Sequence, residues 1–340
     1  MHRRLPAEWE EQDAVLLAWP HAGTDWADTL EAVEPVFTRI AVAISRFERV
    51  LIVAPQVAPV RARLEREGAD PLHLLFAELP TNDTWARDFG PITVLEDGAP
   101  VVLDFGFNAW GLKFAADHDN RVNRGLAAAG LFRAPVRVPG LVLEGGSIDS
   151  DGAGTLLTTT ACLLSPNRNP HLDRAGLERA LADLLGANRV LWLEHGALAG
   201  DDTDAHIDTL ARFCPDDTIA YVRCDDPADE HFAPLAAMEA ELQGFRTGAG
   251  RPYRLVALPW PRPVFDTDGH RLPATYANFL VVNNAVLVPT YRDPQDAAAL
   301  ETLAALLPGR QVIGIDSLPL IHQHVSLHCL TMQLPRGTLV

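Results

Sequence analysis

Cysteine and long hydrophobic runs are scarce in this sequence, and each scarcity argues against a class of protein. The 340 residues include four cysteines, at positions 162, 214, 224 and 329, with no Cys-x-x-Cys pair. Thiols so few and so widely spaced do not make a disulfide framework, so we expect them to be reduced. The longest apolar stretches, such as residues 279–282, are far too short to span a membrane, and the basic N-terminus lacks a signal-peptide core. These features favour a cytoplasmic protein with no membrane partner.

Positive charge is also in short supply. The sequence has 28 Lys and Arg residues against 45 Asp and Glu residues, a formal net charge of −17. So acidic a chain is not expected to bind nucleic acid or an anionic membrane, because both need a basic face. It suits a cationic substrate, although acidity of this size is common among soluble enzymes. Hydrophobic residues make up 48% of the chain, which is ample for a core and excludes a disordered or collagen-like chain.

The chain is organised by a recurring unit of apolar hairpin, amphipathic helix and short strand. In the first unit, strands at 92–95 and 101–105 turn at Glu96-Asp97-Gly98, and a helix at 120–129 and a strand at 135–138 follow. The later units are expected to have a strand at 154–160, a helix at 172–185 and a strand at 190–193; strands at 211–213 and 218–223, a helix at 229–243 and a strand at 253–258; and strands at 279–282 and 285–289, a helix at 294–307 and a strand at 311–315.

The two ends of the chain supply a fifth unit. A strand at 325–333 is expected to pair with a strand at 15–19, which a helix at 30–47 and a strand at 50–54 follow. Joining the ends closes the array and leaves few exposed strand edges. The pattern favours a radial α/β array in one domain, residues 1–340, over a three-layer α/β fold with βαβ crossovers.

Unusual polar clusters occur where these units begin, at intervals of about 50 to 70 residues. They contain Asp88, Glu144, His206 with Asp208, Asn278 and Cys329. In a closed radial array such positions meet at the axis, so we expect one central pocket. Each cluster alone has a simple structural explanation: a local ion pair at Arg87-Asp88, a turn at Glu144-Gly145-Gly146, a hydrogen bond between His206 and Asp208 on one face of a strand, and a buried small side chain at Cys329.

Together, these residue types favour attack on a guanidinium carbon. A cysteine thiolate is the strongest nucleophile of a protein near neutral pH. A histidine beside a carboxylate can give a proton to a leaving group and later take one from water. Further carboxylates can hold a planar cation by paired hydrogen bonds, and an indole such as Trp85 can cover its flat face. The expected substrate is therefore a small cationic guanidino compound.

Four ordered motifs carry a resemblance over nearly the whole chain. They are Trp85-Ala86-Arg87-Asp88-x-Gly90-Pro91, Glu144-Gly145-Gly146-Ser147-Ile148, Thr203-Asp204-x-His206-Ile207-Asp208 and His328-Cys329-x-Thr331-x-Gln333-x-Pro335, with Leu5-Pro6-Ala7-Glu8-Trp9-Glu10 near the start. The chain resembles the agmatine deiminase family, which includes the bacterial Porphyromonas-type peptidyl-arginine deiminases. The resemblance implies the pentein fold, a five-bladed α/β propeller with pseudo-fivefold symmetry. It also implies conversion of agmatine and water to N-carbamoylputrescine and ammonia, with no metal or organic cofactor, in an enzyme that can form a homodimer.

The resemblance implies catalytic roles for five residues. Cys329 attacks the guanidinium carbon and forms a covalent amidino-cysteine intermediate. His206 protonates the departing ammonia and then activates the water that releases the product, while Glu144 orients His206. Asp88 and Asp208 hold the guanidinium nitrogens.

The resemblance also places two further residues at the substrate and leaves one segment unmatched. Trp85 is expected to stack on the substrate, and Asn278 to lie near the nucleophile. Where the family has a glycine-rich run before its His-Cys pair, this chain has Gln323-His324-Val325-Ser326-Leu327. Glycine lets backbone amides approach a substrate closely, so side chains here can reshape the pocket. The choice between agmatine, free arginine and peptidyl arginine stays open.

Other functions are alternatives at this point. The run Asp204-Ala205-His206-Ile207-Asp208 also fits the metal-binding pattern of the di-manganese ureohydrolases, such as agmatinase, although their other ligand strings do not occur in the sequence. His322, His324 and His328 with Cys329 are a candidate zinc site. A protein that binds a guanidino compound without turning it over is a further alternative. The product separates the two hydrolases, because a deiminase releases ammonia and a ureohydrolase releases urea.

Overall fold

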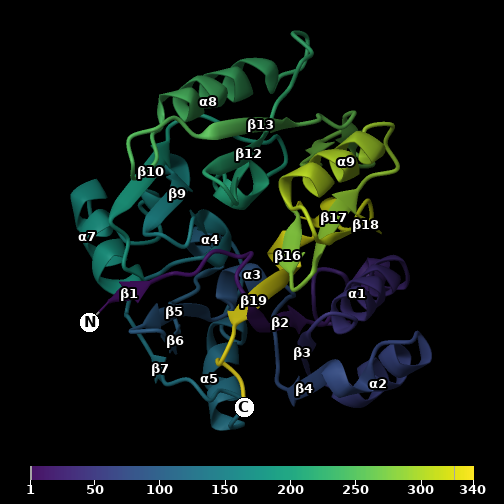
Figure 1. The fold of residues 1–340 in the computed structure, drawn as a ribbon. Helices are drawn as coiled ribbons and strands as arrows, with labels where there is room; N and C mark the ends of the chain where they lie inside the picture. The colour runs from purple at the N-terminus through teal and green to yellow at the C-terminus, as the bar shows by residue number, and fades with distance from the viewer. Residues whose placement is uncertain (1, 325) are drawn as a thin grey trace.

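Strands and helices alternate along the chain and build mixed sheets that lie around a common centre (Figure 1). The computed structural model describes residues 2–324 and 326–340. Within these residues there are five sheets of three or four strands and one two-stranded ribbon, formed by β14 (Val264–Phe265) and β15 (Arg271–Leu272). The longer helices lie on the outside of the ring of sheets.

The sheets repeat one order of strands. An antiparallel hairpin comes first, and a helix then crosses to a third strand that runs parallel to the second strand of the hairpin. The parallel pairing requires a crossover of this kind. The repeats are β5 (Ile92–Glu96), β6 (Ala99–Leu103), α5 (Val122–Ala128) and β7 (Val136–Arg137); β8 (Ile148–Ser150), β9 (Thr155–Thr159), α7 (Arg174–Leu185) and β10 (Arg189–Leu193); β11 (Ala211–Cys214), β12 (Thr218–Val222), α8 (Phe232–Gly244) and β13 (Arg254–Leu258); and β16 (Leu280–Val282), β17 (Ala285–Thr290), α9 (Asp296–Leu306) and β18 (Gln311–Asp316).

The two ends of the chain meet in the fifth sheet, as predicted. The strand β19 (Thr331–Pro335) pairs antiparallel with β2 (Gln12–Ala18), and Gln333 lies opposite Val15. The sheet continues through β3 (Arg49–Ala54) and β4 (Leu74–Glu78), with α1 (Leu30–Ser45) and α2 (Val57–Arg66) as the crossovers. The short strand β1 (Arg3–Arg4) joins the first strand of the neighbouring sheet, β5.

Most predicted elements are confirmed within a few residues, and two predictions are wrong. The C-terminal strand begins at Thr331 and not near 325, because His328–Leu330 forms the short 3-10 helix η7. Val325, where the predicted strand began, lies outside the described residues. His206 and Asp208 do not share a strand face, since Ile207–Thr209 forms the 3-10 helix η5. The helix α2 and the strands β1, β4, β8, β14 and β15 were not predicted.

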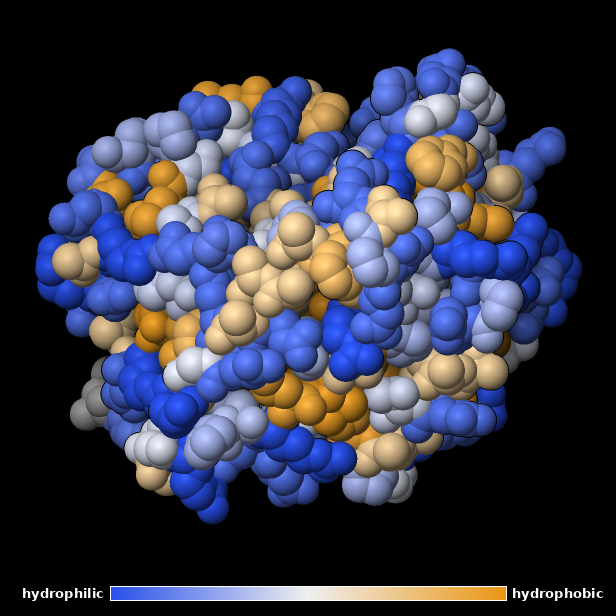
Figure 2. Space-filling model, turned by 90° about the horizontal axis from the view of Figure 1, so that it is seen from above, coloured by the Kyte–Doolittle hydropathy of each residue, from blue (hydrophilic) through white to orange (hydrophobic). Residues whose placement is uncertain are grey.

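The central strands are buried on both faces. All five residues of β9 and of β12 are buried, as are five of the six residues of β17. Such strands read as nearly continuous hydrophobic runs, because a helix covers one face and other parts of the core cover the other. On the face seen in Figure 2, hydrophobic patches lie between larger hydrophilic areas. Among the described helices, none combines the length and the apolar character that crossing a membrane requires.

Candidate active site

The polar clusters of the sequence come together because they occupy equivalent places in the repeated sheets. Asp88 lies in α3 (Ala86–Phe89) just before β5, and Glu144 just before η4 (Gly145–Ser147) and β8. His206 lies just before η5 and β11, Asn278 just before β16, and Cys329 in η7 before β19. All five side chains are buried, with at most 2% of each residue exposed. Short contacts join these side chains, such as 3.3 Å between Asn278 and Cys329 and 3.6 Å between His206 and Asp88, so the clusters do converge.

The Cys329 thiol lies between an amide and a carboxylate. Asn278 Nδ2 is 3.3 Å from the Cys329 sulfur, and the thiol is 3.6 Å from Asp208 Oδ2. Asn278 Oδ1 accepts from the backbone N–H of His328 at 2.8 Å, which fixes the start of η7. Burial raises the pKa of Cys329 well above its ordinary value, and the negative charges of Asp208 and Asp88 raise it further. A bound cation would oppose those charges and favour the thiolate.

His206 faces two carboxylates. Its Nδ1 lies 3.6 Å from Asp88 Oδ1, and its Nε2 lies 3.7 Å from Glu144 Oε2. Neither ring nitrogen has a hydrogen-bond partner among the described residues. Burial alone would lower the pKa of His206, but Asp88, Cys162 and Glu144 together raise it well above the ordinary value. The site therefore favours an imidazolium, which is a proton donor with both nitrogens available.

Two carboxylates of different character border the same space. Asp88 accepts from Gly146 N–H at 3.0 Å and from Trp110 Nε1–H at 2.9 Å. Burial, aided by Asp208 and Glu144, raises the pKa of Asp88 to about 6. For Asp208 burial would raise the pKa, but His328, His206 and Arg212 lower it, so this carboxylate is ionised. Its Oδ1 is buried and has no partner among the described residues, which leaves one acceptor for a bound cation.

The second motif has a glycine at position 146 because there is no space for a side chain there. A Cβ built at this position would lie 2.6 Å from His206 Nδ1 and 2.8 Å from Asp88 Oδ1. Any side chain would therefore enter the space between the two groups. The absence of a side chain also lets the Gly146 backbone N–H reach Asp88.

Trp85 lies in an aromatic group beside Asp88, and Trp110 is a residue that the sequence analysis missed. The Trp85 ring centroid is 5.5 Å from that of Trp26 and 6.3 Å from that of Trp110. Trp110 belongs to α4 (Ala109–Leu112), in which all four residues have positive φ angles between 51° and 86°. Backbone held in this sparsely populated region is common at functional sites, where other contacts fix it. Here one of the fixing contacts is the indole hydrogen bond to Asp88.

Arg168 is a second residue that the sequence analysis missed. Its side chain is fully buried, and its Nε donates to both Glu144 oxygens at 2.8 and 3.0 Å. Its Nη1 binds Asp204 Oδ2 at 2.7 Å, and Lys113 binds the other Asp204 oxygen at 2.8 Å. Arg168 thus fixes the carboxylate that faces His206. Its position in the sequence, between Asn167 and Asn169 in a loop, gives no sign of this role.

Replacing Arg168 with glutamine should destabilise the fold strongly. The free energy of unfolding should fall by about 3–5 kcal/mol, because the buried Glu144 would lose both of its hydrogen bonds to the guanidinium and His206, 3.7 Å away, does not replace them. Arg336→Gln is the matched control, since the Arg336–Glu11 pair is 71% and 63% exposed and should matter by about 1 kcal/mol or less. Urea unfolding of both variants measures the difference. Equal losses of unfolding free energy in the two variants would show that the buried pair stabilises the fold no more than the exposed pair does.

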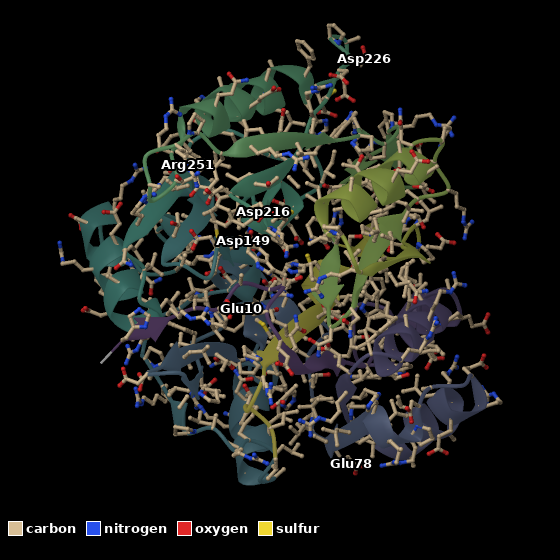
Figure 3. The ribbon with its side chains drawn as sticks, viewed as in Figure 1. Glu10, Glu78, Asp149, Asp216, Asp226 and Arg251 are labelled. Atoms are coloured by element: carbon tan, nitrogen blue, oxygen red, sulfur yellow. The ribbon has the colours of Figure 1, made fainter. Side chains whose placement is uncertain are left out.

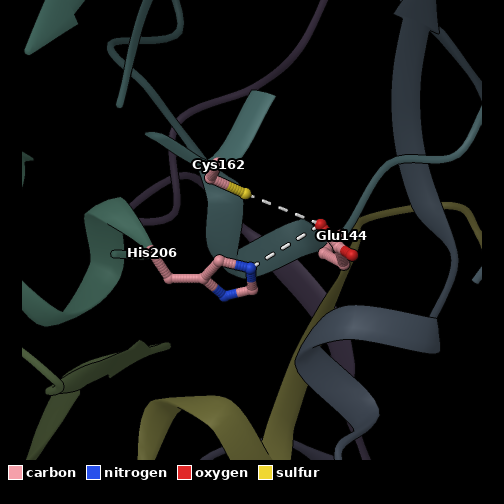
Figure 4. A group of neighbouring side chains, drawn as sticks. All are labelled: Glu144, Cys162 and His206. Atoms are coloured by element: carbon pink, nitrogen blue, oxygen red, sulfur yellow. Dashed lines mark hydrogen bonds and ion pairs between the residues drawn. The ribbon is translucent and has the colours of Figure 1, made fainter. Parts of the chain in front are cut away.

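One group of side chains in the described part of the chain has the spacing of a metal site. Glu144, Cys162 and His206 each offer one ligand atom, and these atoms lie within 4.8 Å of one another (Figure 4). However, the Glu144 oxygen that faces the other two also accepts from the Arg168 guanidinium at 2.8 Å. That hydrogen bond already uses a lone pair that a metal ion would need, and a divalent ion would bring more positive charge next to Arg168 than an imidazolium does. The group is therefore better suited to holding a protonated His206 than to holding a metal ion.

The structure also bears on the two metal alternatives from the sequence. His328 has one carboxylate at each ring nitrogen, Asp208 and Glu8, so neither nitrogen is free for zinc. His324 Nδ1 faces the Gly200 carbonyl at 2.8 Å. In the candidate manganese run, Asp204 binds Arg168 and Lys113. Its carboxylate is thus held by two cations outside the group that surrounds Cys329.

An α/β fold whose sheets converge on a thiol, an imidazole and carboxylates is typical of enzymes that attack amidine carbon through cysteine. Comparison with known proteins gives the family. The family model for Porphyromonas-type peptidyl-arginine deiminase matches residues 4–335. The chain belongs to this family, as the motifs indicated.

Relatives are similar over almost the full chain. An agmatine deiminase of Pseudomonas aeruginosa (strain LESB58) is 34% identical, across 98% of this chain and 95% of its own length. A Porphyromonas gingivalis structure, named provisionally as an arginine deiminase, is 53% identical with a TM-score of 0.94, covering 99% of this chain and 100% of its own. A variant agmatine deiminase of C. jejuni with substrate bound is 39% identical with a TM-score of 0.92, covering 99% and 97%. A dimethylarginine dimethylaminohydrolase, with 12% identity and a TM-score of 0.52, shares the fold alone.

Proposed function

We propose that this protein is an agmatine deiminase-type hydrolase, which converts agmatine and water to N-carbamoylputrescine and ammonia. The observation that carries the proposal is the group around Cys329. The buried thiol lies 3.6 Å from an ionised carboxylate, near a histidine that favours its protonated form. Nucleophile, proton donor and cation-binding oxygens are thus assembled before substrate arrives. Agmatine deiminases of other bacteria supply the substrate by similarity.

Binding is assigned to the carboxylates. Asp88 and Asp208 hold the guanidinium, with the free Asp208 Oδ1 as one acceptor. Trp85 covers the planar group, and Asn278 keeps Cys329 in place. The substrate cation also offsets the charges that raise the pKa of Cys329, so binding itself promotes formation of the thiolate. Burial excludes water and strengthens each of these interactions.

The chemistry follows in two halves. The Cys329 thiolate attacks the guanidinium carbon, and the imidazolium of His206 gives its proton to the nitrogen that departs as ammonia. The carbon is then bound to sulfur as an amidino-cysteine. Neutral His206, facing Glu144 at 3.7 Å, next removes a proton from water as the water oxygen attacks the same carbon. Collapse of that adduct breaks the carbon–sulfur bond and releases the ureido product.

Agmatine is the preferred substrate in this proposal because the site is rich in negative charge. Asp88, Asp208 and Glu144 surround the reacting groups, and the whole chain carries −17. Arg168 and Lys113 are both bound to Asp204, so neither is free to hold a substrate carboxylate. Peptidyl arginine and free arginine are the alternative substrates for the same reaction, and the P. gingivalis relative is named provisionally as an arginine deiminase.

The finer points of architecture are also proposals. We infer that the five sheets are the blades of a propeller with pseudo-fivefold symmetry and that residues 1–340 form one domain. The repeated order of hairpin, helix and parallel strand supports this, as does the contribution of every sheet to one site. A cytoplasmic location is supported by four free cysteines. A homodimer is proposed from the family resemblance.

Product analysis over a panel of guanidino compounds tests the function. We expect ammonia and not urea, with kcat/KM for agmatine roughly 10 to 100 times that for arginine, since a missing partner for a charged group costs about 1–3 kcal/mol. Equal or better turnover of arginine or arginine-terminated peptides would show that the substrate is wrong. Urea would favour a ureohydrolase, and binding with no product would favour a non-catalytic protein.

A further inference from the structure

His328, the residue before Cys329, lies between two carboxylates. Its Nδ1 is 2.7 Å from Asp208 Oδ2, and its Nε2 is 2.7 Å from Glu8 Oε2. Glu8 comes from the N-terminal segment, more than 300 residues away in the sequence. His328 is buried, with 2% of the residue exposed. The ring therefore links the N-terminal segment to Oδ2 of Asp208, while Oδ1 of the same carboxylate has no partner among the described residues.

The hydrogen-bond chemistry of this contact favours a charged ring. An ionised carboxylate can only accept hydrogen bonds, so a ring nitrogen next to it must carry a proton. Against burial, and apart from His328 itself, His206 and Arg212 lower the pKa of Asp208 and favour its ionised form. Burial would raise the pKa of Glu8, but Arg212 and Arg87 lower it independently of His328, and Glu8 Oε2 accepts from Arg212 Nη2 at 2.7 Å. Each nitrogen of His328 thus faces a carboxylate oxygen, an arrangement that a ring protonated at both nitrogens satisfies.

His231 provides an internal comparison. It is also buried and also has a carboxylate at Nδ1, with Asp229 at 2.8 Å. Its Nε2, however, accepts from the Ala199 backbone N–H at 2.8 Å and so carries no proton. The two histidines thus have similar burial and a carboxylate at Nδ1, and they differ in the partner of Nε2, which is an N–H donor for His231 and a carboxylate for His328.

The groups that contact one another around Glu8 also favour a positive His328. Glu8 also contacts Arg212 at 2.7 Å and Arg87 at 3.6 Å, and Arg212 contacts Asp149 at 3.3 Å. Asp149 is labelled near the centre of the molecule in Figure 3. Glu8, Asp149 and Asp208 together bring three acidic groups, against two from Arg87 and Arg212. A buried cluster left with an unpaired charge is costly, and the imidazolium supplies the third cation.

We propose that His328 is a positioning residue, present as an imidazolium, that holds Asp208 by Oδ2 and directs Oδ1 to the substrate's guanidinium. The positive charge of His328 also favours the Cys329 thiolate. His328 Nδ1 and the Cys329 sulfur both contact Asp208 Oδ2, so they lie within roughly 6 Å of each other. The inference rests on the proposed function for the identity of the cation that Asp208 meets. The protonation of His328 in the free protein does not depend on it.

Nitrogen NMR of the wild-type protein tests the protonation directly. With 15N-labelled histidine at pH 7.5, both ring nitrogens of His328 should have the shifts of protonated nitrogen, whereas His231 should have one of each kind. His328→Gln and His231→Gln identify the two sets of signals by their loss. An unprotonated nitrogen on His328 would overturn the proposal whatever the enzyme's activity.

Kinetics of His328→Gln test the positioning. We expect kcat/KM for agmatine to fall about 10- to 100-fold, with His231→Gln close to wild type. The acid limb of kcat, which reports the enzyme–substrate complex, should move up by about one to two pH units, because losing a positive charge disfavours the thiolate. The variant leaves the other charged groups around the ring unchanged, so the shift reports His328. These groups are Glu8, Asp149, Asp208, Arg87 and Arg212. An unmoved acid limb would contradict the proposal. If the variant does not fold, the ring signals of His328 are assigned through bonds from its own backbone signals, and the NMR result decides.

Discussion

Replacing Cys329 with serine should reduce turnover of agmatine by at least about a thousandfold while leaving the fold intact. A serine hydroxyl is far less acidic than a thiol, so it cannot supply the anion that attacks the guanidinium carbon. The substitution removes no packing volume of consequence, and Asn278 still has an acceptor at that position. Turnover is measured as ammonia release, and circular dichroism checks the fold.

Cys214→Ser is the matched control for this result. Cys214 is also buried, and burial raises the pKa of its thiol to about 12, but it lies in β11 and takes no part in the group around Cys329. The control should stay within a few fold of wild type. Near-normal activity in Cys329→Ser would rule out the covalent mechanism.

Replacing Asp88 with asparagine should cost about 10²- to 10⁴-fold in kcat/KM, the second largest effect expected. The variant loses one of the two charges that hold the guanidinium. It also turns an amide group toward Trp110 Nε1–H and Gly146 N–H, both of which donate to Asp88 in the wild type. Steady-state kinetics with agmatine give the size of the loss.

The pH profile distinguishes this effect from misfolding. Because the pKa of Asp88 is about 6, wild-type kcat/KM should fall as the pH drops below about 6, where the carboxyl group is neutral and no longer holds a cation. The same raised pKa means that the ionised group is penalised in the folded state, so stability from this group falls as the pH rises from about 4 to 6. Asp88→Asn removes the penalty, and its melting temperature at pH 8 should not fall. A lower melting temperature with an unchanged pH profile would contradict the assignment.

The repeated fold could be predicted because each of its hairpins and helices has a sequence pattern within its own segment. Turn residues such as Glu96-Asp97-Gly98 separate apolar strands, and helical periodicity follows, so each hairpin and helix is visible in its own segment. The pairing of β19 with β2 could be predicted only from the number of units, since the two strands lie at opposite ends of the chain. The convergence of Asp88, Glu144 and Cys329 followed from the same repeat.

The two strand predictions were wrong at places where side chains, and not neighbouring strands, accept the hydrogen bonds of backbone N–H groups. Asp201 accepts from the backbone N–H groups of Thr203 and Ala205, and both Asp204 and Ala205 have positive φ, so the chain turns just before His206 and no strand forms there. At the C-terminal end, Asn278 Oδ1 accepts from the His328 backbone N–H, which is therefore not part of a strand ladder. Asp201 is a local partner, of the type that often forms turns, whereas Asn278 lies 50 residues from His328 and nothing in the C-terminal segment identifies it.

The residues missed at the site were missed for a related reason. Arg168 lies in a loop, and only the folded structure brings its guanidinium to Glu144, 24 residues earlier in the chain. Trp110 contacts Asp88 because four consecutive residues adopt positive φ, and two of them, Ala109 and Leu112, rarely adopt such values. Functional groups that act through a second residue leave little trace in a single sequence.

The central claim is that Cys329 forms a bond to the amidine carbon of the substrate. Intact-mass spectrometry of enzyme mixed with agmatine and quenched in acid tests it most directly. The mass should rise by that of agmatine less one ammonia, peptide mapping should place the addition on Cys329, and the Cys329→Ser variant should show none. Turnover of agmatine by wild-type enzyme that yields urea, with no added mass on Cys329, would contradict the account.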